Sequence, residues 1–253
     1  MHPNFINFSF FSISSGQLFS LIALVVFVLT LILLAPKNRL KLHILNLTLI
    51  PSLIMGVIIG RLFYVFSDLN YYFFDVSLAS LYRAIAIFQD LNISFSGFVI
   101  GSIGYFLITA KKRHENIKKW ADLTIIASLF AFAIIAIGNF LEGTAYGRPT
   151  NLFWGIRVSN PLVKYTSEIH PTQIFTFLYS LIIGLKTLNY HTNKDGHKAL
   201  YGLYYFSMFK CIETLFRGDD TLQFWILRSD TILSLGMFIY LRQKMFIHKM
   251  LKK

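Results

Sequence analysis

Seven stretches of the chain are mostly apolar and about as long as a bilayer is thick, although two of them contain charges: Lys210 and Glu213 in one, Arg228 and Asp230 in the other. A helix needs about 20 apolar residues to cross roughly 30 Å of hydrocarbon. The runs therefore predict membrane-spanning helices at about residues 16–35, 44–66, 93–110, 120–141, 171–188, 199–216 and 223–241. A shorter apolar run at residues 77–88 is more typical of a helix at the membrane interface. The pattern predicts an all-α, polytopic membrane protein.

The composition agrees with a membrane location. Of the 253 residues, 55% are hydrophobic, and the mean hydropathy is +0.57. Only 14% are Asp, Glu, Lys or Arg, against about 25% in soluble domains. The formal net charge of +12 would suggest a nucleic-acid partner in a soluble protein. Here it indicates loops that face an anionic leaflet, so no nucleic acid is expected as a partner.

The cysteine count argues against a disulfide-bonded or metal-binding protein, and the N-terminal residues argue against a cleavable signal peptide. The single cysteine, Cys211, excludes an internal disulfide, and no Cys/His spacing typical of a metal site occurs. We therefore expect no metal and no other cofactor. The N-terminal residues MHPNFINFSFF include no Lys or Arg, which a cleavable signal peptide would carry. We expect the first helix to be retained.

Lysine and arginine are distributed unevenly between alternate connections. Sixteen of them lie in segments 36–43, 111–119, 186–198 and 242–253, and five lie in segments 67–92, 142–170 and 217–222. Cytoplasmic loops carry the excess of Lys and Arg. The asymmetry predicts an outside N-terminus and a cytoplasmic C-terminus, which requires an odd number of spans. Because no internal repeat occurs, we expect one integral domain over residues 1–253, with the sparsely charged segments forming an outer-side arm and head region.

A polar, glycine-rich stretch, IGNFLEGTAYGRPTNLFWG at residues 137–155, begins where the fourth predicted helix leaves the bilayer. One interpretation is a helix end with a left-handed glycine, with Asn139 bonded to a neighbouring helix. The other is a turn of small residues that lets a lipid headgroup or substrate approach the backbone. His170, at the start of the fifth span, is either structural or a general base. Both alternatives stay open at this point.

Charges inside or near membrane spans are costly and tend to be functional. Basic residues in such places include Arg61, Lys210 and Arg217. Cations that face a common cavity would suit a lipid phosphate. The alternative is snorkelling, or pairing with Glu213 or Asp230.

Several motifs, in consistent order over about residues 56–240, resemble the bacterial phosphatidylglycerol–prolipoprotein diacylglyceryl transferase family. The stretch IGNFLEGTAYGRPT is similar to the family signature Gly-Arg-x-Gly-Asn-Phe-x-Asn-Gly-Glu-x-x-Gly. The other matching stretches are GRLFYVF at 60–66, SFSG at 94–97, HPTQIF at 170–175, FKCIETLFRGDD at 209–220 and ILSLG at 232–236.

The resemblance implies an enzyme of the bacterial inner membrane. Family members transfer the diacylglyceryl group from phosphatidylglycerol to the lipobox cysteine of a prolipoprotein signal peptide. The expected partners are thus phosphatidylglycerol, or another anionic phospholipid, and a prolipoprotein signal peptide. The resemblance implies a substrate-binding set of Arg61, Asn139, Gly143, Gly147, Arg148, Gln173, Lys210 and Arg217. The catalytic candidates are His170, Glu142 and Ser96.

The chain departs from the family pattern at positions that bear on chemistry. Ser96 stands where the family has a histidine, and Ala136 replaces the signature arginine. Lys210 replaces an arginine and so loses the bidentate guanidinium fork. These departures raise an alternative, in which the chain is a catalytically impaired homologue that binds lipid or lipoprotein as a membrane subunit. A transporter is a third class, disfavoured because no repeat of broken helices occurs.

Overall fold

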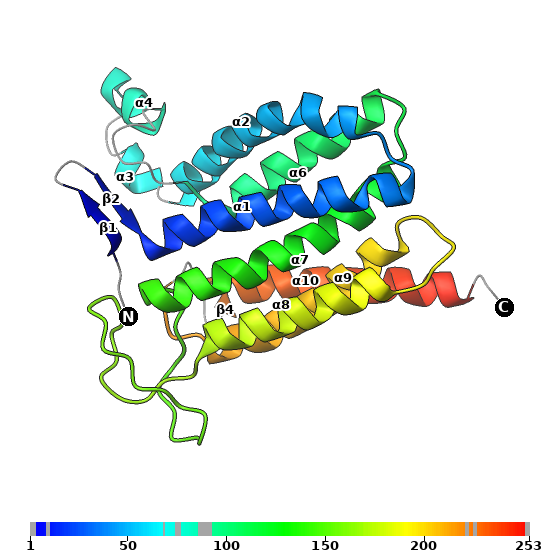
Figure 1. Cartoon of the computed structure of the whole chain (residues 1–253). Coiled ribbons are helices and arrows are strands. Elements are labelled where there is room, and N and C mark those ends of the chain that lie inside the picture. The colour runs from blue at the N-terminus through cyan, green and yellow to red at the C-terminus, as the bar shows by residue number, and fades with distance from the viewer. Residues whose placement is uncertain are drawn as a thin grey trace. The chain divides into compact units, whose positions relative to one another are not determined.

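The computed structural model describes residues 4–8, 11–67, 69–73, 77–85, 93–220, 223–224 and 227–250. The chain divides into two compact units (Figure 1). The large unit comprises Met1–Leu34 and Ala121–Lys253, and the small unit comprises Ala35–Trp120.

Helices dominate both units. The large unit contains α1 (Ser15–Leu34), most of α7 (Ile117–Glu142), α8 (Thr172–Asn189), α9 (His197–Phe216) and α10 (Ser229–Met250). Two short antiparallel pairs accompany them, β1 (Asn4–Phe8) with β2 (Phe11–Ser14) and β3 (Gln223–Phe224) with β4 (Leu227–Arg228). The small unit contains the 3-10 helix η1 (Pro36–Asn38), α2 (Leu42–Ser67), α3 (Leu69–Tyr72), α4 (Leu78–Ile85) and α6 (Phe95–Lys112). Apart from the strand pairs, the predicted helical class is confirmed.

Each of the seven apolar runs contains a long helix. The last prediction, 223–241, began too early, because β3 and β4 pair as a hairpin before α10 starts at Ser229. Among the described residues, the helical segments Ser15–Asn38, Leu42–Ser67 and Ile117–Glu142 are long and apolar enough to cross a membrane. The interfacial run is helical at α4, and residues 86–88 lie outside the described ranges.

Glycines bring α2 and α6 of the small unit into close contact. A Cβ on Gly97 would lie 2.9 Å from Gly60 Cα, and one on Gly101 would lie 2.7 Å from Met55 O. The Ser94 amide also donates to Gly60 O at 3.0 Å. The two helices therefore approach backbone to backbone, as small residues allow in membranes.

Replacing Gly97 with alanine is expected to separate α2 from α6, since the new methyl group meets backbone atoms that cannot rotate away. Overpacking of this kind costs about 1–3 kcal/mol. Gly104 provides a matched control on the same helix, because a Cβ there meets nothing within 4 Å. Thermal unfolding in detergent should show a lower midpoint for Gly97→Ala and an equal or higher midpoint for Gly104→Ala. Equal midpoints for both variants would contradict the close crossing.

The large unit packs α1 against α7 and α8 against α9. A Cβ on Gly138 of α7 would lie 2.5 Å from the Phe19 Cβ of α1. Phe206 of α9 contacts Phe132 of α7 and Tyr179 of α8, with ring centroids 5.1 and 5.8 Å apart. These contacts hold the helices that carry the candidate site.

A buried carboxylate closes the start of α9. Asp122 of α7 accepts hydrogen bonds from the backbone amides of Gly196 and Ala199 at 2.8 and 2.7 Å. These amides belong to the helix N-terminus, where the first N–H groups lack helical partners and the dipole favours an anion. The sequence offered no signal for this cap, since Asp122 precedes Gly196 by 74 residues.

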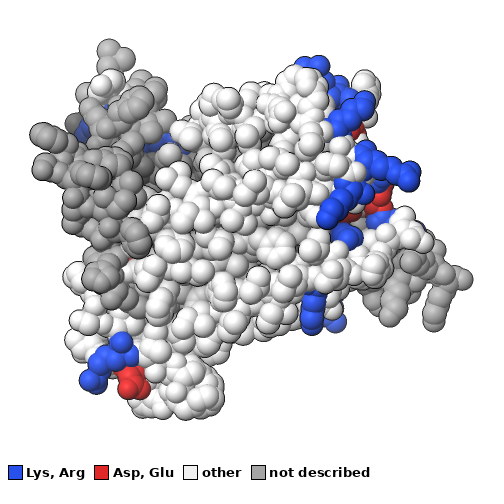
Figure 2. All heavy atoms as spheres, viewed as in Figure 1, with Lys and Arg blue, Asp and Glu red and all other residues white. Residues whose placement is uncertain are grey.

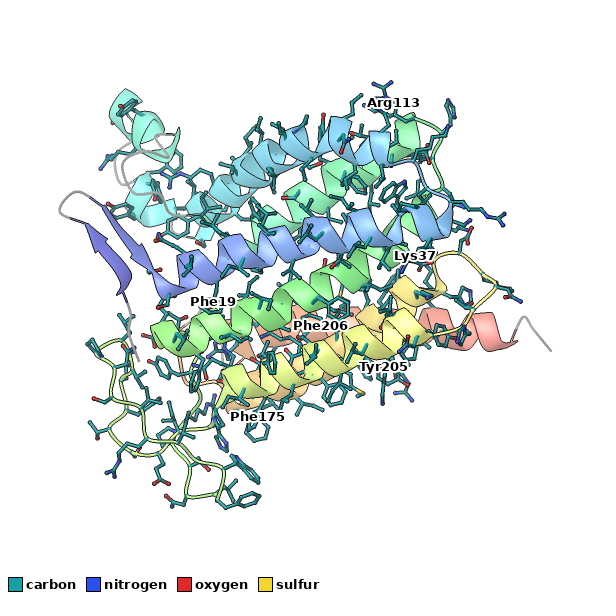
Figure 3. The ribbon with its side chains drawn as sticks, viewed as in Figure 1. Phe19, Lys37, Arg113, Phe175, Tyr205 and Phe206 are labelled. Atoms are coloured by element: carbon teal, nitrogen blue, oxygen red, sulfur yellow. The ribbon has the colours of Figure 1, made fainter. Side chains whose placement is uncertain are left out.

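On the face shown in Figure 2, most of the visible Lys and Arg lie near helix ends, and the surface along the helices shows no charge. Within the small unit, Lys37 and Arg113 lie at the same end of the α2–α6 pair (Figure 3). Two of the Lys- and Arg-rich connections therefore share one end of this helix pair.

Candidate functional site

The α7–α8 loop, residues 143–171, is held against the end of α9 by backbone hydrogen bonds. The Arg148 amide donates to Phe216 O at 2.8 Å, and the Gly218 amide donates to Tyr146 O at 2.9 Å. The His170 amide donates to Arg148 O at 3.0 Å. Three segments far apart in the sequence therefore lie side by side, and they bring Arg148, His170 and Arg217 together.

The end of α7 is a helix C-terminus closed by a left-handed glycine. Gly143 has φ of +86°, and the amides of Gly143 and Thr144 both donate to Asn139 O. Asn160 stabilises this turn, because its Nδ2 donates to Glu142 O at 2.8 Å and leaves no room for a side chain on Gly143. The first interpretation of the polar stretch is thus confirmed in its left-handed glycine. Asn139 Oδ1 contacts Thr144 Oγ1 at 3.4 Å.

The first turn of α8 fixes the next residues of the loop. Gln173 Nε2 donates to Thr144 O at 2.7 Å, and Thr172 Oγ1 donates to Ala145 O at 2.7 Å. Ala145 has φ of +55°, a left-handed conformation that costs a residue with a Cβ about 1–2 kcal/mol. The two side-chain donors offset this cost. Gln173 was predicted to bind substrate, but its amide group binds the loop backbone.

Gly147 and His170 lie in direct contact. A Cβ on Gly147 would come within 2.3 Å of His170 O and 2.6 Å of His170 Cβ. The His170 ring packs edge-on against Phe216, with centroids 5.0 Å apart. Gly147 therefore serves the close approach of two backbone segments, and only a glycine fits there.

The indole of Trp154 donates a hydrogen bond from Nε1 to His170 Nδ1 at 2.9 Å. His170 is buried, and burial lowers the pKa of its imidazole below the ordinary value. The contact acts in the same direction, because a protonated Nδ1 would set two N–H groups against each other. His170 is therefore a neutral imidazole at pH 7.

Four charges form a compact cluster between the end of α9 and the start of α10. Arg217 contacts Asp219, with Nε 2.9 Å from Oδ1, and it reaches Asp230 at 3.5 Å. Arg228 donates to Asp219 O at 2.7 Å and to Asp219 Oδ1 at 3.0 Å. Burial of the guanidinium opposes its charge, but the hydrogen bond to Asp219 and the nearby carboxylates outweigh it and raise the pKa of Arg217. Arg217 thus stays charged at the centre of the site.

Arg148 is the more open cation of the loop. Its Nε donates to Arg217 O at 3.0 Å, and the side chain is exposed. Within the part of the chain that the structure describes, its two Nη atoms have no hydrogen-bond partner. Arg148 therefore presents a guanidinium face next to Arg217, a geometry that suits a phosphate. Lys164, farther along the loop, pairs with Asp220.

Lys210 is paired inside the α8–α9 interface. Its Nζ lies 3.0 and 3.2 Å from the two oxygens of Glu213. Glu213 also accepts from Tyr179 OH at 2.6 Å and from Thr176 Oγ1 at 2.8 Å. The pairing alternative predicted for Lys210 is confirmed, and Arg217 likewise pairs with Asp230.

The remaining predicted residues have other surroundings. The Glu142 carboxylate lies against the first turn of α1, where a Cβ on Gly16 would be 2.1 Å from Oε2. In the small unit, Arg61 donates to the carbonyls of Arg83 and Ala84 at 2.9 Å and lies over the Tyr72 ring. Arg61 thereby caps the end of α4.

Ser96, also in the small unit, is exposed, and its Oγ lies 3.0 Å from Ser94 Oγ. Ser94 is the N-cap of α6, because its side chain accepts from the Gly97 amide. Ala136, which replaces the signature arginine, is buried within α7.

Several residues of the site were missed in the sequence. Arg228 and Asn160 bind residues of the site but lie in no matching motif. Asp219 lies in the stretch FKCIETLFRGDD but was not singled out, and no contact of Trp154 with His170 was predicted. One signal was available for Arg228, which is a charge inside a run that predicts a span and therefore indicates a partner.

The sequence matches the family described as prolipoprotein diacylglyceryl transferase over residues 3–246. The chain belongs to this family. The match covers nearly the whole chain, including both units and every residue of the site described above.

Curated relatives carry the same name. The chain is 26% identical over 212 residues to the phosphatidylglycerol–prolipoprotein diacylglyceryl transferase of Clostridium tetani, covering 78% of this chain and 80% of that protein. It is 31% identical over 151 residues to that of Clostridioides difficile, covering 60% and 56%. It is 30% identical over 138 residues to that of Thermotoga maritima, covering 52% and 45%. The chain thus spans about half the length of the last two relatives that it matches.

Proposed function

We propose that the protein transfers a diacylglyceryl group from phosphatidylglycerol to the lipobox cysteine thiol of a prolipoprotein. The family match over residues 3–246 is the observation that carries this proposal. In the reaction the thiol sulfur forms a bond to a glycerol carbon, the bond from that carbon to the phosphate oxygen breaks, and glycerol 1-phosphate leaves. The thiol proton is lost to a base or to the leaving group.

The phosphate carries the charge that the enzyme has to stabilise. Arg217 and Arg148 suit this task, because Arg148 Nε donates to Arg217 O and, within the described part of the chain, the Nη donors of Arg148 are unoccupied. Guanidinium groups bind phosphate through two parallel hydrogen bonds. Lys210 and Arg61 then act indirectly, the first through Glu213 and the second by holding α4.

Glu142 and Ser96 remain candidates for a role in proton transfer, on the strength of the motifs that contain them. His170 is the third candidate, but its Nδ1 already accepts a hydrogen bond.

The topology proposed for this activity has seven spans, with the N-terminus outside and the C-terminus in the cytoplasm of the bacterial inner membrane. The uneven distribution of Lys and Arg supports it. The α7–α8 loop would then lie at the outer leaflet, where both the lipid and the prolipoprotein arrive. Asn139, Gly143 and Gly147 would shape that loop.

The test is expression in bacterial cells depleted of their own transferase. We expect diacylglyceryl-modified lipoprotein to appear by mass spectrometry, and growth to recover. Cells with an empty vector supply the control, and the protein's presence in the membrane is verified by immunoblotting. Unmodified prolipoprotein alongside normal membrane expression would refute the proposal.

The comparisons favour this enzyme over the non-catalytic lipid- or lipoprotein-binding homologue, because the curated relatives carry the transferase name. Ser96 and Ala136 motivated that alternative, and the family match spans both positions.

A further inference from the structure

The hydrogen bond between Trp154 and His170 determines which nitrogen of the imidazole carries the proton. Indole Nε1–H is a donor and has no acceptor capacity. Nδ1 of His170, 2.9 Å away, must therefore accept, and cannot hold a proton itself. A neutral imidazole has one protonated nitrogen, so the proton is on Nε2. His170 is thereby fixed as a hydrogen-bond donor.

The Nε2–H group has no partner within the part of the chain that the structure describes, although His170 is only 7% exposed. Among the described residues, Nε2 is not one of the fully buried polar atoms that lack a partner, so this donor remains accessible to a ligand although most of the residue is buried. The ring sits against Phe216, and the His170 amide donates to Arg148 O. The unpartnered donor thus lies within the three segments that also supply Arg148 and Arg217.

We propose that His170 donates a hydrogen bond from Nε2 to a phosphate oxygen of the lipid substrate, and that Trp154 is the positioning residue that fixes this donor form. The inference rests on the proposed function for the identity of the lipid. It assigns His170 to binding of the leaving phosphate and removes it as the base for the thiol, since neither nitrogen of the bound form can take up a proton. Trp154 acts through its hydrogen bond to His170.

Histidine NMR tests the donor form directly. The protein, labelled with ¹⁵N-histidine, is placed in phosphatidylcholine nanodiscs with and without phosphatidylglycerol, and the His170 signals are assigned by their loss in His170→Gln. We expect a neutral ring protonated at Nε2 at pH 7, and a downfield shift of that proton when phosphatidylglycerol is present. A ring protonated at Nδ1, a charged ring, or no response to phosphatidylglycerol would overturn the proposal.

Two substitutions at His170 separate a donor at Nε2 from one at Nδ1. The glutamine amide nitrogen reaches about the place of Nε2, whereas the asparagine amide nitrogen reaches about the place of Nδ1. We expect His170→Gln to retain activity within about tenfold of wild type, and His170→Asn to lose about 10–100-fold, as for a lost hydrogen bond to a charged group. Equal activities, or a more active asparagine variant, would refute the donor role.

Trp154→Phe removes the indole N–H but keeps an aromatic ring. The NMR spectrum of this variant should show a mixture of both neutral tautomers, together with a loss of activity. Trp120→Phe is the matched control, because Trp120 Nε1 is buried with no hydrogen-bond partner among the described residues, and the ring packs against Phe106. That variant should leave the His170 signals unchanged. An unaltered tautomer in Trp154→Phe would exclude Trp154 as the positioning residue.

The two proposals can fail separately. A wild-type chain that modifies no prolipoprotein refutes the proposed function, while the phosphatidylglycerol response of Nε2–H still decides the inference. If the wild type is active but His170→Asn is at least as active as His170→Gln, the inference is refuted. The proposed transferase activity is then unaffected.

Discussion

Replacing Arg217 with alanine is expected to lower the transferase kcat/KM by about 10²–10³-fold, the usual cost of removing one preorganised electrostatic contact. Arg217 is held in place before any substrate arrives, since Asp219 and Asp230 contact its guanidinium and Gly147 pairs with its backbone. Its pKa is raised, so it is charged at every pH at which the enzyme works. The alanine variant leaves Asp219 next to the incoming phosphate, and this adds repulsion to the lost attraction.

Two further variants distinguish the effect of the guanidinium group from the effects of positive charge alone and of a surface substitution. Arg217→Lys keeps the charge but loses the fork, so its activity should fall between those of alanine and wild type. Arg157→Ala removes an exposed arginine of the same loop and should leave the activity within about twofold, as expected of surface positions. The measurement uses phosphatidylglycerol vesicles and a lipobox peptide, with thermal midpoints compared first. Activity near wild type in a folded Arg217→Ala would mean that other cations hold the phosphate.

The helices could be predicted from the sequence because length and hydropathy alone decide them in a membrane. Each of the seven runs contains a helix. The start of α10 could not be predicted in this way. The β3–β4 hairpin lies within an apolar run, and its strand pairing is a tertiary feature that a hydropathy window averages away.

The sequence indicated which residues gather at the site, but for most of them it did not indicate what each side chain binds. Arg148, His170 and Arg217 do come together, because the connections that contain them join helix ends on one side of the large unit. Their partners depend on contacts between distant segments, such as Trp154 with His170 or Asn160 with the end of α7. Such contacts leave no periodic pattern of apolar and polar residues in the sequence. Gln173 illustrates the consequence, since its amide binds the loop backbone where a substrate was expected.

The ion pair between Lys210 and Glu213 weakens the prediction that Lys210 binds substrate. Lys210 was predicted to do so, because a cation inside a span is costly and calls for a role. The structure supplies a role in Glu213, whose carboxylate is almost fully buried and accepts from Lys210, Tyr179 and Thr176. Neutralising that carboxylate is enough to explain a lysine at this position.

Replacing Lys210 with methionine is therefore expected to destabilise the fold by about 2–4 kcal/mol, because it leaves Glu213 charged and buried without a cation. Removing one partner of a fully buried pair costs about 3–5 kcal/mol. The lysine side chain is 24% exposed and that of Glu213 is 3% exposed, so the expected cost falls at or below that range. The effect is measured as a lower thermal midpoint in detergent, by several degrees.

The double variant Lys210→Met with Glu213→Gln decides whether charge balance is the reason. Glutamine is uncharged, and its carbonyl can still accept hydrogen bonds from Tyr179 and Thr176. The double variant should therefore recover at least half of the decrease in thermal midpoint that Lys210→Met causes. Glu213→Gln alone completes the cycle, since it shows what loss of the carboxylate costs while Lys210 is present. If the double variant were no more stable than Lys210→Met, the lysine would act by filling space or by binding a ligand. The substrate-binding role first expected for it would then regain support.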